Sequence, residues 1–334
     1  MRLTLLILAA ALLLASCGSF SAPGGRIEVA GFLRIGGIDQ WVTIRGEQAS
    51  NPLLLLVHGG PGDVQSPLVA TYAPYEKDFV VVQWDQRGAG RTFEKLGQAT
   101  PGLTLERLVA DGIELAEHLR RVFPKNRLVL LGHSWGSVVA VGMVRQRPEY
   151  FAAYVGTGQV SRWADSVQFQ FEFLKKAARD TGDAALLSEL EAIGRPDPKN
   201  VQQYFGFTRS LRNFMHPADR AWLAGLKELF LGLPGRTEAD LEAIGGGMNF
   251  SGRALIGATV EEDLFVTAPR LELPVYVIQG RDDLSTPTEG AKAWHDAVAA
   301  PKKRFVVIAD AGHFALVTHR EAFVAELVQL LGEK

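Results

Sequence analysis

The chain has 334 residues and a formal net charge of −2 at pH 7. A nearly neutral chain without a block of basic residues lacks the electrostatic footprint of a nucleic-acid-binding protein. It contains a single cysteine, Cys17, so disulfide bonds within the chain are excluded and an apolar core must hold the fold together. No repeat of fixed period is visible, which excludes solenoids and propellers.

The first 16 residues have the pattern of a secretory signal peptide. Met1 and Arg2 form a short basic start, and the apolar run that follows is shorter than the about 20 residues of a membrane-spanning helix. The tetrapeptide Leu-Ala-Ser-Cys that ends at Cys17 is typical of a bacterial lipobox, in which the cysteine becomes lipidated. An ordinary signal peptide, cleaved nearby, is the alternative. We therefore expect an exported bacterial lipoprotein at the periplasmic or cell-envelope face, with membrane contact only through the anchor and residues 17–25 as a flexible tether.

After the tether, two alternating segments at 27–35 and 40–45 flank a Gly-Gly pair and predict an antiparallel hairpin. Later runs are short and almost wholly apolar, which is typical of strands buried on both faces of a parallel sheet. Helix-like stretches alternate with these runs and predict a doubly wound α/β architecture. The expected buried strands are residues 53–57, 79–84, 128–131, 154–156, 275–279 and 304–309, and the clearest expected helices are 104–122, 289–300 and 321–331.

Between residues 161 and 270 the strand-like runs stop, and the sequence becomes helical and rich in aromatic residues. We expect this segment to be a helical cap inserted after the sixth strand, with residues 26–160 and 271–334 forming the α/β core. Most of the cap aromatics are expected to form the core of the cap, and a few to line a pocket beneath it. The Gly-Gly-Gly at 245–247 predicts a break, hinge or loop inside the cap.

The motif Gly-His-Ser-Trp-Gly at 132–136 lies between an expected strand and a helix-like run. A strand, a sharp turn with serine at its apex and a helix form the nucleophile elbow of an α/β-hydrolase. The glycines suit a turn that strains the backbone and brings the strand close to the helix. We therefore expect an α/β-hydrolase fold with a mostly parallel eight-stranded sheet and an inserted helical cap, and Ser134 as the nucleophile.

A serine nucleophile needs a general base and a carboxylate that orients the base. In this fold the acid follows a late strand and the histidine follows the last one. The strand expected at 275–279 runs into Asp282 and Asp283, and the strand at 304–309 is followed by His313. Asp283 is the expected acid, since the usual pattern has a glycine three residues before it and a proline shortly after; Asp282 is expected to be a solvated turn carboxylate. His313 is the expected base.

Backbone N–H groups must also bind the oxyanion that forms on the attacked carbonyl. The loop His-Gly-Gly-Pro-Gly at 58–62 follows the strand expected at 53–57, so we expect the N–H groups of Gly60 and Trp135 to be these donors. His58 is expected to brace this loop. The histidines lack metal-ligand spacing, so neither a metal nor another cofactor is expected.

Three motifs together resemble the proline iminopeptidase group of α/β-hydrolases: His-Gly-Gly-Pro-Gly at 58–62, Asp-Gln-Arg-Gly-Ala-Gly-Arg-Thr at 85–92, and Gly132 to Ser137. The second motif is the most distinctive, because it is not general to the fold. The resemblance implies a serine hydrolase that forms a covalent acyl-enzyme and removes N-terminal residues, often proline, from short peptides.

Two alternatives remain open. The pattern G-H-S-x-G is also common among esterases and lipases, so a carboxylic ester hydrolase is the first alternative. The second is a non-catalytic surface lipoprotein that binds a small ligand. An aminopeptidase needs a buried carboxylate for the substrate ammonium group, but the acidic residues of the cap are expected to be solvated. These residues are Glu172, Glu189, Glu191, Glu228 and Glu261-Glu262-Asp263.

Overall fold

The computed structural model of the chain describes residues 25–64 and 66–332. The predicted signal peptide, Cys17 and the tether up to residue 24 lie outside these ranges, so export and lipidation stay predictions from the sequence. Within the described ranges, no helix is both long enough and apolar enough to cross a membrane.

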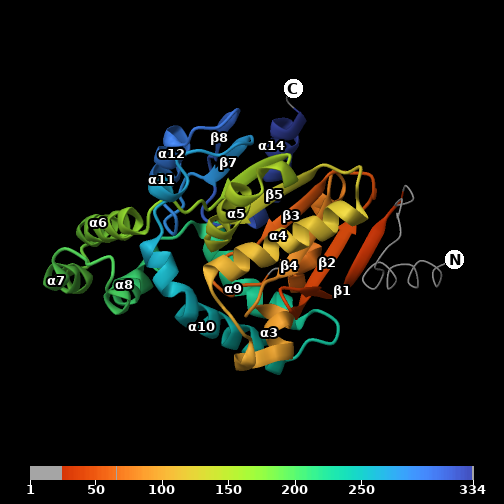
Figure 1. The fold of residues 1–334 in the computed structure, drawn as a ribbon. Coiled ribbons are helices and arrows are strands. Elements are labelled where there is room, and N and C mark those ends of the chain that lie inside the picture. The colour runs from red at the N-terminus through yellow and green to blue at the C-terminus, as the bar shows by residue number, and fades with distance from the viewer. Residues whose placement is uncertain (1–24, 65, 333–334) are drawn as a thin grey trace.

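In the described residues, eight strands form one sheet in the order β1-β2-β4-β3-β5-β6-β7-β8. β1 pairs with β2 and β2 with β4 in the antiparallel sense, and the other neighbouring pairs are parallel. This sheet confirms the predicted fold class (Figure 1). The strands are β1 (Ile27–Ile35), β2 (Ile38–Gly46), β3 (Leu53–Val57), β4 (Val80–Asp85), β5 (Leu128–His133), β6 (Ala153–Thr157), β7 (Val275–Gly280) and β8 (Lys303–Ile308).

The apolar strands are buried on both faces of the sheet. Alternate side chains of a strand point to opposite faces. Leu55 of β3 accordingly packs in a core cluster with residues of α4 (Leu105–Val122) and α5 (Trp135–Gln146). Its neighbour Leu54 packs in a second cluster with residues of α14 (Arg320–Gly332). This two-sided burial is why these strands lack polar alternation.

The predicted N-terminal hairpin is confirmed, with Ile35 opposite Ile38 across its turn. The turn residues Gly36 and Gly37 have φ of 56° and 78°. Two successive residues with positive φ match the tight turn whose twist suits a two-residue hairpin, and glycine adopts this backbone at no steric cost.

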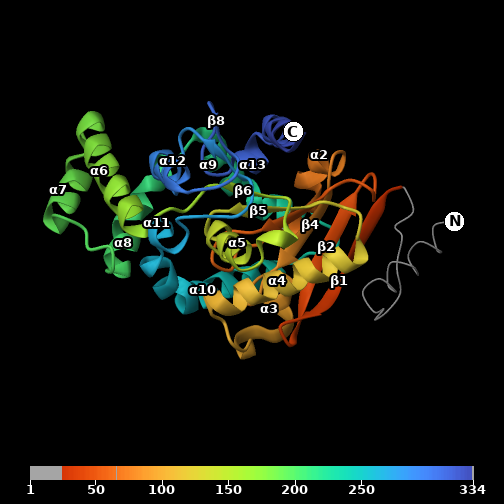
Figure 2. The same cartoon turned by 45° about the horizontal axis from the view of Figure 1, so that its top comes forward.

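Between β6 and β7 the chain forms α6 to α11, which we call the cap helices. In Figures 1 and 2, α6, α7 and α8 lie on the side of the molecule away from β1, and α10 runs beside α3. The cap helices are α6 (Trp163–Thr181), α7 (Ala184–Ile193), α8 (Val201–Thr208), α9 (Pro217–Leu231), α10 (Glu238–Glu261) and α11 (Leu264–Thr267), with the short η4 (Arg209–Asn213) after α8. The remaining elements are η1 (Ser66–Tyr72), α2 (Ala73–Glu76), α3 (Gly90–Leu96), η2 (Gly97–Ala99), η3 (Pro148–Tyr150), α12 (Thr288–Ala297) and α13 (Ala315–Thr318).

The predicted break at Gly-Gly-Gly 245–247 was wrong, because α10 runs through these residues without interruption. The glycines instead allow close packing against α3. A Cβ on Gly246 or Gly247 would lie 3.3 Å from the ring of Phe93, and a Cβ on Gly247 also 3.1 Å from the carbonyl oxygen of Gly88. A glycine inside a helix costs about 1 kcal/mol relative to alanine, and here the tertiary contact offsets that cost.

Candidate active site

Ser134 occupies a sharp turn between β5 and α5. Its φ of 55° is the one positive φ of a non-glycine residue in the part of the chain that the structure describes. The flanking glycines make room for the turn: a Cβ on Gly136 would lie 2.0 Å from the carbonyl oxygen of Val57, and a Cβ on Gly132 would lie 2.7 Å from the Cα of Ser137. The geometry is that of a strained elbow that presents its apex side chain.

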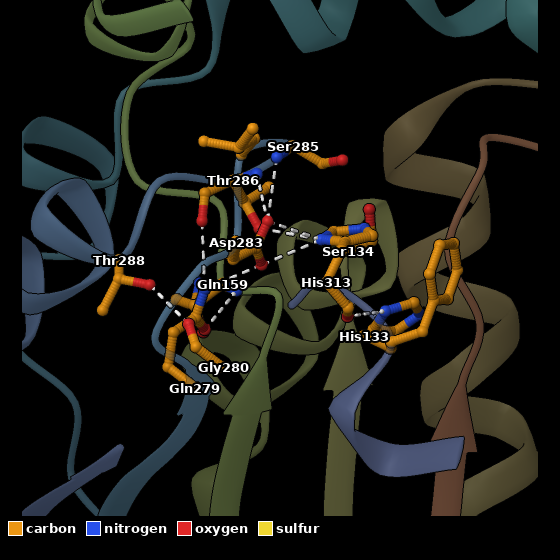
Figure 3. A network of polar contacts seen from close by, with 12 residues as sticks. His133, Ser134, Gln159, Gln279, Gly280, Asp283, Ser285, Thr286, Thr288 and His313 are labelled. Carbon is orange, nitrogen blue, oxygen red and sulfur yellow. Dashed lines mark hydrogen bonds and ion pairs between the residues drawn. The ribbon is translucent and has the colours of Figure 1, made fainter. Parts of the chain in front are cut away.

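His313 and Asp283 form a hydrogen-bonded pair. Nδ1 of His313 lies 2.9 Å from Oδ2 and 3.0 Å from Oδ1 of Asp283, which is only 2 % exposed (Figure 3). The carboxylate also accepts hydrogen bonds from the side-chain amide of Gln279, the hydroxyl of Thr286, and the backbone N–H groups of Ser285 and Thr286, each at 2.9 Å. These donors hold its orientation toward the imidazole.

The predicted nucleophile and the predicted base lie at one cavity of about 790 Å³. Ser134 and His313 both line it, and Figure 3 shows Ser134 beside the imidazole. Asp283 joins them through His313, whereas Asp282 is exposed, as expected. The three residues predicted for the catalytic chemistry therefore lie together in the structure.

The charge state of His313 follows from its surroundings. Burial lowers the pKa of His313, but the Asp283 carboxylate beside it and the carboxylates of Asp219 and Asp63 raise it, so that the pKa lies above its ordinary value of 6.5. Opposite charges near a histidine favour its protonated form. The site thus stabilises the imidazolium that forms when His313 accepts a proton.

The glycine loop after β3 packs against the elbow. A Cβ on Gly59 would lie 3.0 Å from the Cβ of Ser134, and Gly60 lines the same cavity as Ser134. Trp135 is the first residue of α5, where backbone N–H groups have no acceptor within the helix. Gly60 and Trp135 thus flank Ser134, and their binding of an oxyanion stays a prediction.

His58 braces this loop, in agreement with the expectation. Its Nε2 accepts a hydrogen bond from the backbone N–H of Gln86 at 3.2 Å, and its Nδ1 lies 2.9 Å from the carbonyl oxygen of Gly59. The Gln86 side-chain amide donates to the carbonyl of His58 at 3.1 Å. Burial lowers the pKa of His58 to about 4, so the ring is neutral near pH 7 and ties the loop to the 85–92 motif.

The rest of the 85–92 motif is structural. The hydroxyl of Thr92 donates to the carbonyl of Asp85 at 2.6 Å, and the backbone N–H of Arg91 donates to the Asp85 carboxylate at 3.0 Å. Arg87 forms a buried ion pair with Asp111 at 2.8 Å. These contacts hold the motif together and attach it to Asp111 of α4, and Gln86 connects it to the loop of His58.

The cavity is lined mainly by apolar side chains. Among its described lining residues, Asp63 is the one carboxylate, and none of the cap carboxylates named above lines it. Arg212, on η4, also lines the cavity and is exposed. Several cap aromatics line it, as expected, whereas others form the core of the cap. The cap aromatics that line the cavity are Tyr204, Phe205, Trp222 and Phe230, and Phe171 and Phe207 are among those in the cap core.

Sequence reasoning missed two residues of this region. Asp219, on α9, accepts a hydrogen bond from the backbone N–H of His313 at 2.6 Å, although the two residues are 94 positions apart. No sequence signal marks it, because the contact depends on how the cap helices fold onto the core. Asp63 directly follows the glycine motif at 58–62, and this position was the signal that could have revealed it.

Comparison with known proteins agrees with this architecture. The profile of the alpha/beta hydrolase family matches residues 54–326. The chain is 31 % identical over 287 residues to a Bacillus subtilis protein named probable aminopeptidase YbaC, with 84 % of this chain and 89 % of the relative covered. The fold is similar to that of a proline iminopeptidase-related protein from Thermus thermophilus (TM-score 0.61, 22 % identity, 91 % and 97 % covered). It is also similar to that of an esterase from Exiguobacterium antarcticum (TM-score 0.57, 17 % identity, 91 % and 100 % covered). The chain belongs to the alpha/beta hydrolase family, and within that family it is a proline iminopeptidase-like hydrolase.

Proposed function

We propose that the protein is a serine aminopeptidase that uses Ser134, His313 and Asp283 as its catalytic triad. The observation that carries this proposal is the meeting of the strained Ser134 elbow and the His313–Asp283 pair at one cavity. Ser134 attacks the carbonyl carbon while His313 accepts the hydroxyl proton, and the N–H groups of Gly60 and Trp135 bind the oxyanion.

The reaction then proceeds through an acyl-enzyme. His313 returns its proton to the leaving amine as the carbon–nitrogen bond breaks, which leaves the acyl group on Ser134. A water molecule, deprotonated by His313, attacks this ester and releases the acid and the serine hydroxyl. Asp283 holds the imidazole in the tautomer with the proton on Nδ1 and stabilises the imidazolium.

Asp63 is our candidate for recognition of the substrate ammonium group. Its Oδ1 accepts the backbone N–H of Val64 at 2.7 Å, and a Cβ on Gly60 would lie 2.5 Å from the backbone nitrogen of Asp63. The carboxylate therefore belongs to the same tight turn as the predicted oxyanion donor. An N-terminal ammonium group is one carbon away from the scissile carbonyl, so a carboxylate at this edge of the cavity suits an aminopeptidase. The apolar lining suits a bulky apolar N-terminal residue.

Replacing Asp63 with asparagine should lower kcat/KM about 10- to 100-fold for aminoacyl nitroanilides with a free amine, because a hydrogen bond to a charged group contributes about 1.5–3 kcal/mol. At a pH above the acid limb, where loss of the Asp63 charge near His313 does not change the rate, the same variant should cleave acyl nitrophenyl esters without an amine as fast as the wild type. Glu172→Gln, at an exposed cap carboxylate, is the matched control. Equal loss for both substrate classes would contradict amine recognition by Asp63.

The pH dependence of kcat/KM should show the raised pKa of His313. His313 must be neutral to accept the serine proton, and its pKa lies above 6.5. Activity should therefore be full above that pKa and fall as the pH decreases through it, with the half-point above pH 6.5. A half-point at or below this value in a steady-state pH profile would contradict the raised pKa.

An ester hydrolase is the second candidate, and the mainly apolar cavity with one lining carboxylate among the described residues favours it. Wild-type protein offered proline and leucine nitroanilides beside acyl nitrophenyl esters decides between the two. Amide cleavage supports the aminopeptidase. Rapid ester turnover without amide cleavage would contradict the aminopeptidase proposal and support the ester hydrolase.

A further inference from the structure

The two backbone polar groups of His313 are both held by side chains from distant parts of the chain. Its N–H donates to Oδ2 of Asp219 at 2.6 Å, and its carbonyl oxygen lies 3.1 Å from Nε2 of His133. We infer that Asp219 and His133 are positioning residues that place the catalytic imidazole, and we call this pair the His313 clamp. The inference rests on the proposed role of His313 as general base.

Asp219 contributes from the cap. It lies in the first turn of α9, is 1 % exposed, and accepts a second hydrogen bond, at 3.2 Å, from the backbone N–H of Phe314. Two hydrogen bonds to successive N–H groups fix both the position and the direction of the loop. The approach is close enough to require glycine beside it, since a Cβ on Gly312 would lie 2.1 Å from Oδ2 of Asp219.

His133 contributes from the elbow. It directly precedes Ser134, is 2 % exposed, and its ring centroid lies 4.9 Å from that of His313. A carbonyl oxygen only accepts hydrogen bonds, so Nε2 of His133 carries the proton and donates it. Burial is the main cause that lowers the pKa of His133 to about 3, so the ring is neutral at working pH. Its Nδ1 is buried and has no partner among the described atoms.

The clamp connects the Ser134 elbow, the His313 loop after β8 and the cap helices, which are far apart along the chain. Ser134 and His313 come from loops after β5 and β8, and proton transfer requires hydrogen-bond distance between them. His133 ties the histidine loop directly to the elbow, and Asp219 ties the same loop to the cap helices. Because a misplacement of 1 Å can cost about 10²-fold in rate, these bonds bear on catalysis as well as on folding.

Asp219 also acts on His313 through its charge. The charged or titratable groups around His313 are Asp283 after β7, Asp219 on α9, Asp63 after β3 and His133 on β5. The three carboxylates raise the pKa of His313. His133 is neutral, so it places no negative charge near His313. Removal of the Asp219 charge should therefore move the acid limb of the pH profile to lower pH. Loss of His133 removes no charge, so no such shift is expected from it.

The first test is Asp219→Asn in the full chain. We expect kcat for a small nitrophenyl ester to fall about 10- to 100-fold with KM little changed, and the acid half-point of kcat/KM to move to lower pH. The matched control is Asp310→Asn. Asp310 lies in the same loop and contacts His216 next to α9 at 3.2 Å, but its side chain is 94 % exposed, so this variant should behave like the wild type.

The second test is His133→Gly with His133→Gln as the conservative variant. The glycine variant loses the donor, and kcat should fall about tenfold or more. The glutamine amide can donate to the carbonyl of His313, so it should restore much of kcat. If both clamp residues act through His313, the double variant Asp219→Asn with His133→Gly should lose less than the product of the two single effects.

Fluorophosphonate labelling separates failure of the clamp from failure of the proposed function. A wild-type protein that does not label at Ser134 would overturn the triad itself. A wild-type protein that labels, together with folded Asp219→Asn and His133→Gly variants that label and turn over at the wild-type rate and show an unshifted acid limb, would overturn the clamp alone. Variants that melt earlier but keep wild-type kcat and pH profile would also overturn it, because the contacts would then serve stability only.

Discussion

Replacing Ser134 with alanine is expected to lower kcat by about 10³-fold or more while the fold is retained. The substitution removes only the hydroxyl group that we propose as the nucleophile. Alanine carries the same Cβ as serine, so the backbone strain at φ 55° and the packing of the elbow between Gly132 and Gly136 are unchanged. The residual rate would come from the oxyanion donors and substrate binding, which remain.

The measurement is turnover of a nitrophenyl ester and a nitroanilide, combined with fluorophosphonate labelling and thermal unfolding. The wild type should label at one serine, and the variant should not label although its melting temperature is similar. Ser188→Ala, at an exposed position of α7, is the matched control. Unchanged turnover in a folded Ser134→Ala protein would remove Ser134 from the mechanism.

Replacing Asp283 with asparagine is expected to lower kcat by about 10⁴-fold. Nδ1 of His313 and the amide of Gln279 donate to this carboxylate, and so do the hydroxyl and N–H of Thr286 and the N–H of Ser285. An asparagine would present an N–H₂ group to some of these donors. The imidazole would then favour the tautomer with the proton on Nε2, which cannot accept the proton of Ser134.

The same substitution should also lower the free energy of unfolding by about 1–3 kcal/mol, because a buried donor loses its acceptor. Steady-state kinetics and denaturant unfolding measure the two effects separately. Asp282→Asn is the matched control, since Asp282 is the adjacent carboxylate and is exposed. Wild-type kcat in Asp283→Asn, or an equal loss in the control, would contradict the assignment of the acid.

Much of the fold could be predicted because its signals are local. Residues 53–57 of β3 and residues 128–131 of β5 are continuously apolar, since both faces of the sheet are covered by helices. The first hairpin follows from two adjacent glycines that adopt positive φ. The glycines of α10 were wrongly predicted to break the helix. They are needed for close packing against Phe93 and Gly88, which lie far away in the sequence.

The elbow, the acid and the base could be predicted because each follows the end of a strand. A parallel sheet brings those strand ends to one edge, so the order of Ser134, Asp283 and His313 along the chain implies their meeting in space. The stabilising donors of Asp283 also lie within a few residues of it, apart from His313. Ser134, Asp283 and His313 could therefore be predicted from the strand that precedes each of them and from the residues next to each along the chain.

Only the tertiary structure decided which distant side chains surround those groups. Asp219 reaches His313 because α9 packs over the loop after β8, and Asp63 lines the cavity because of the tight turn at Gly60. None of the cap carboxylates named above lines the cavity, although Glu262 and Asp263 are half-buried and not solvated as expected. Helical periodicity alone could not establish this for so many short helices. Motifs describe residues that are neighbours along the chain, whereas cap packing is a sum of weak contacts between segments about 100 residues apart, and no local pattern encodes that sum.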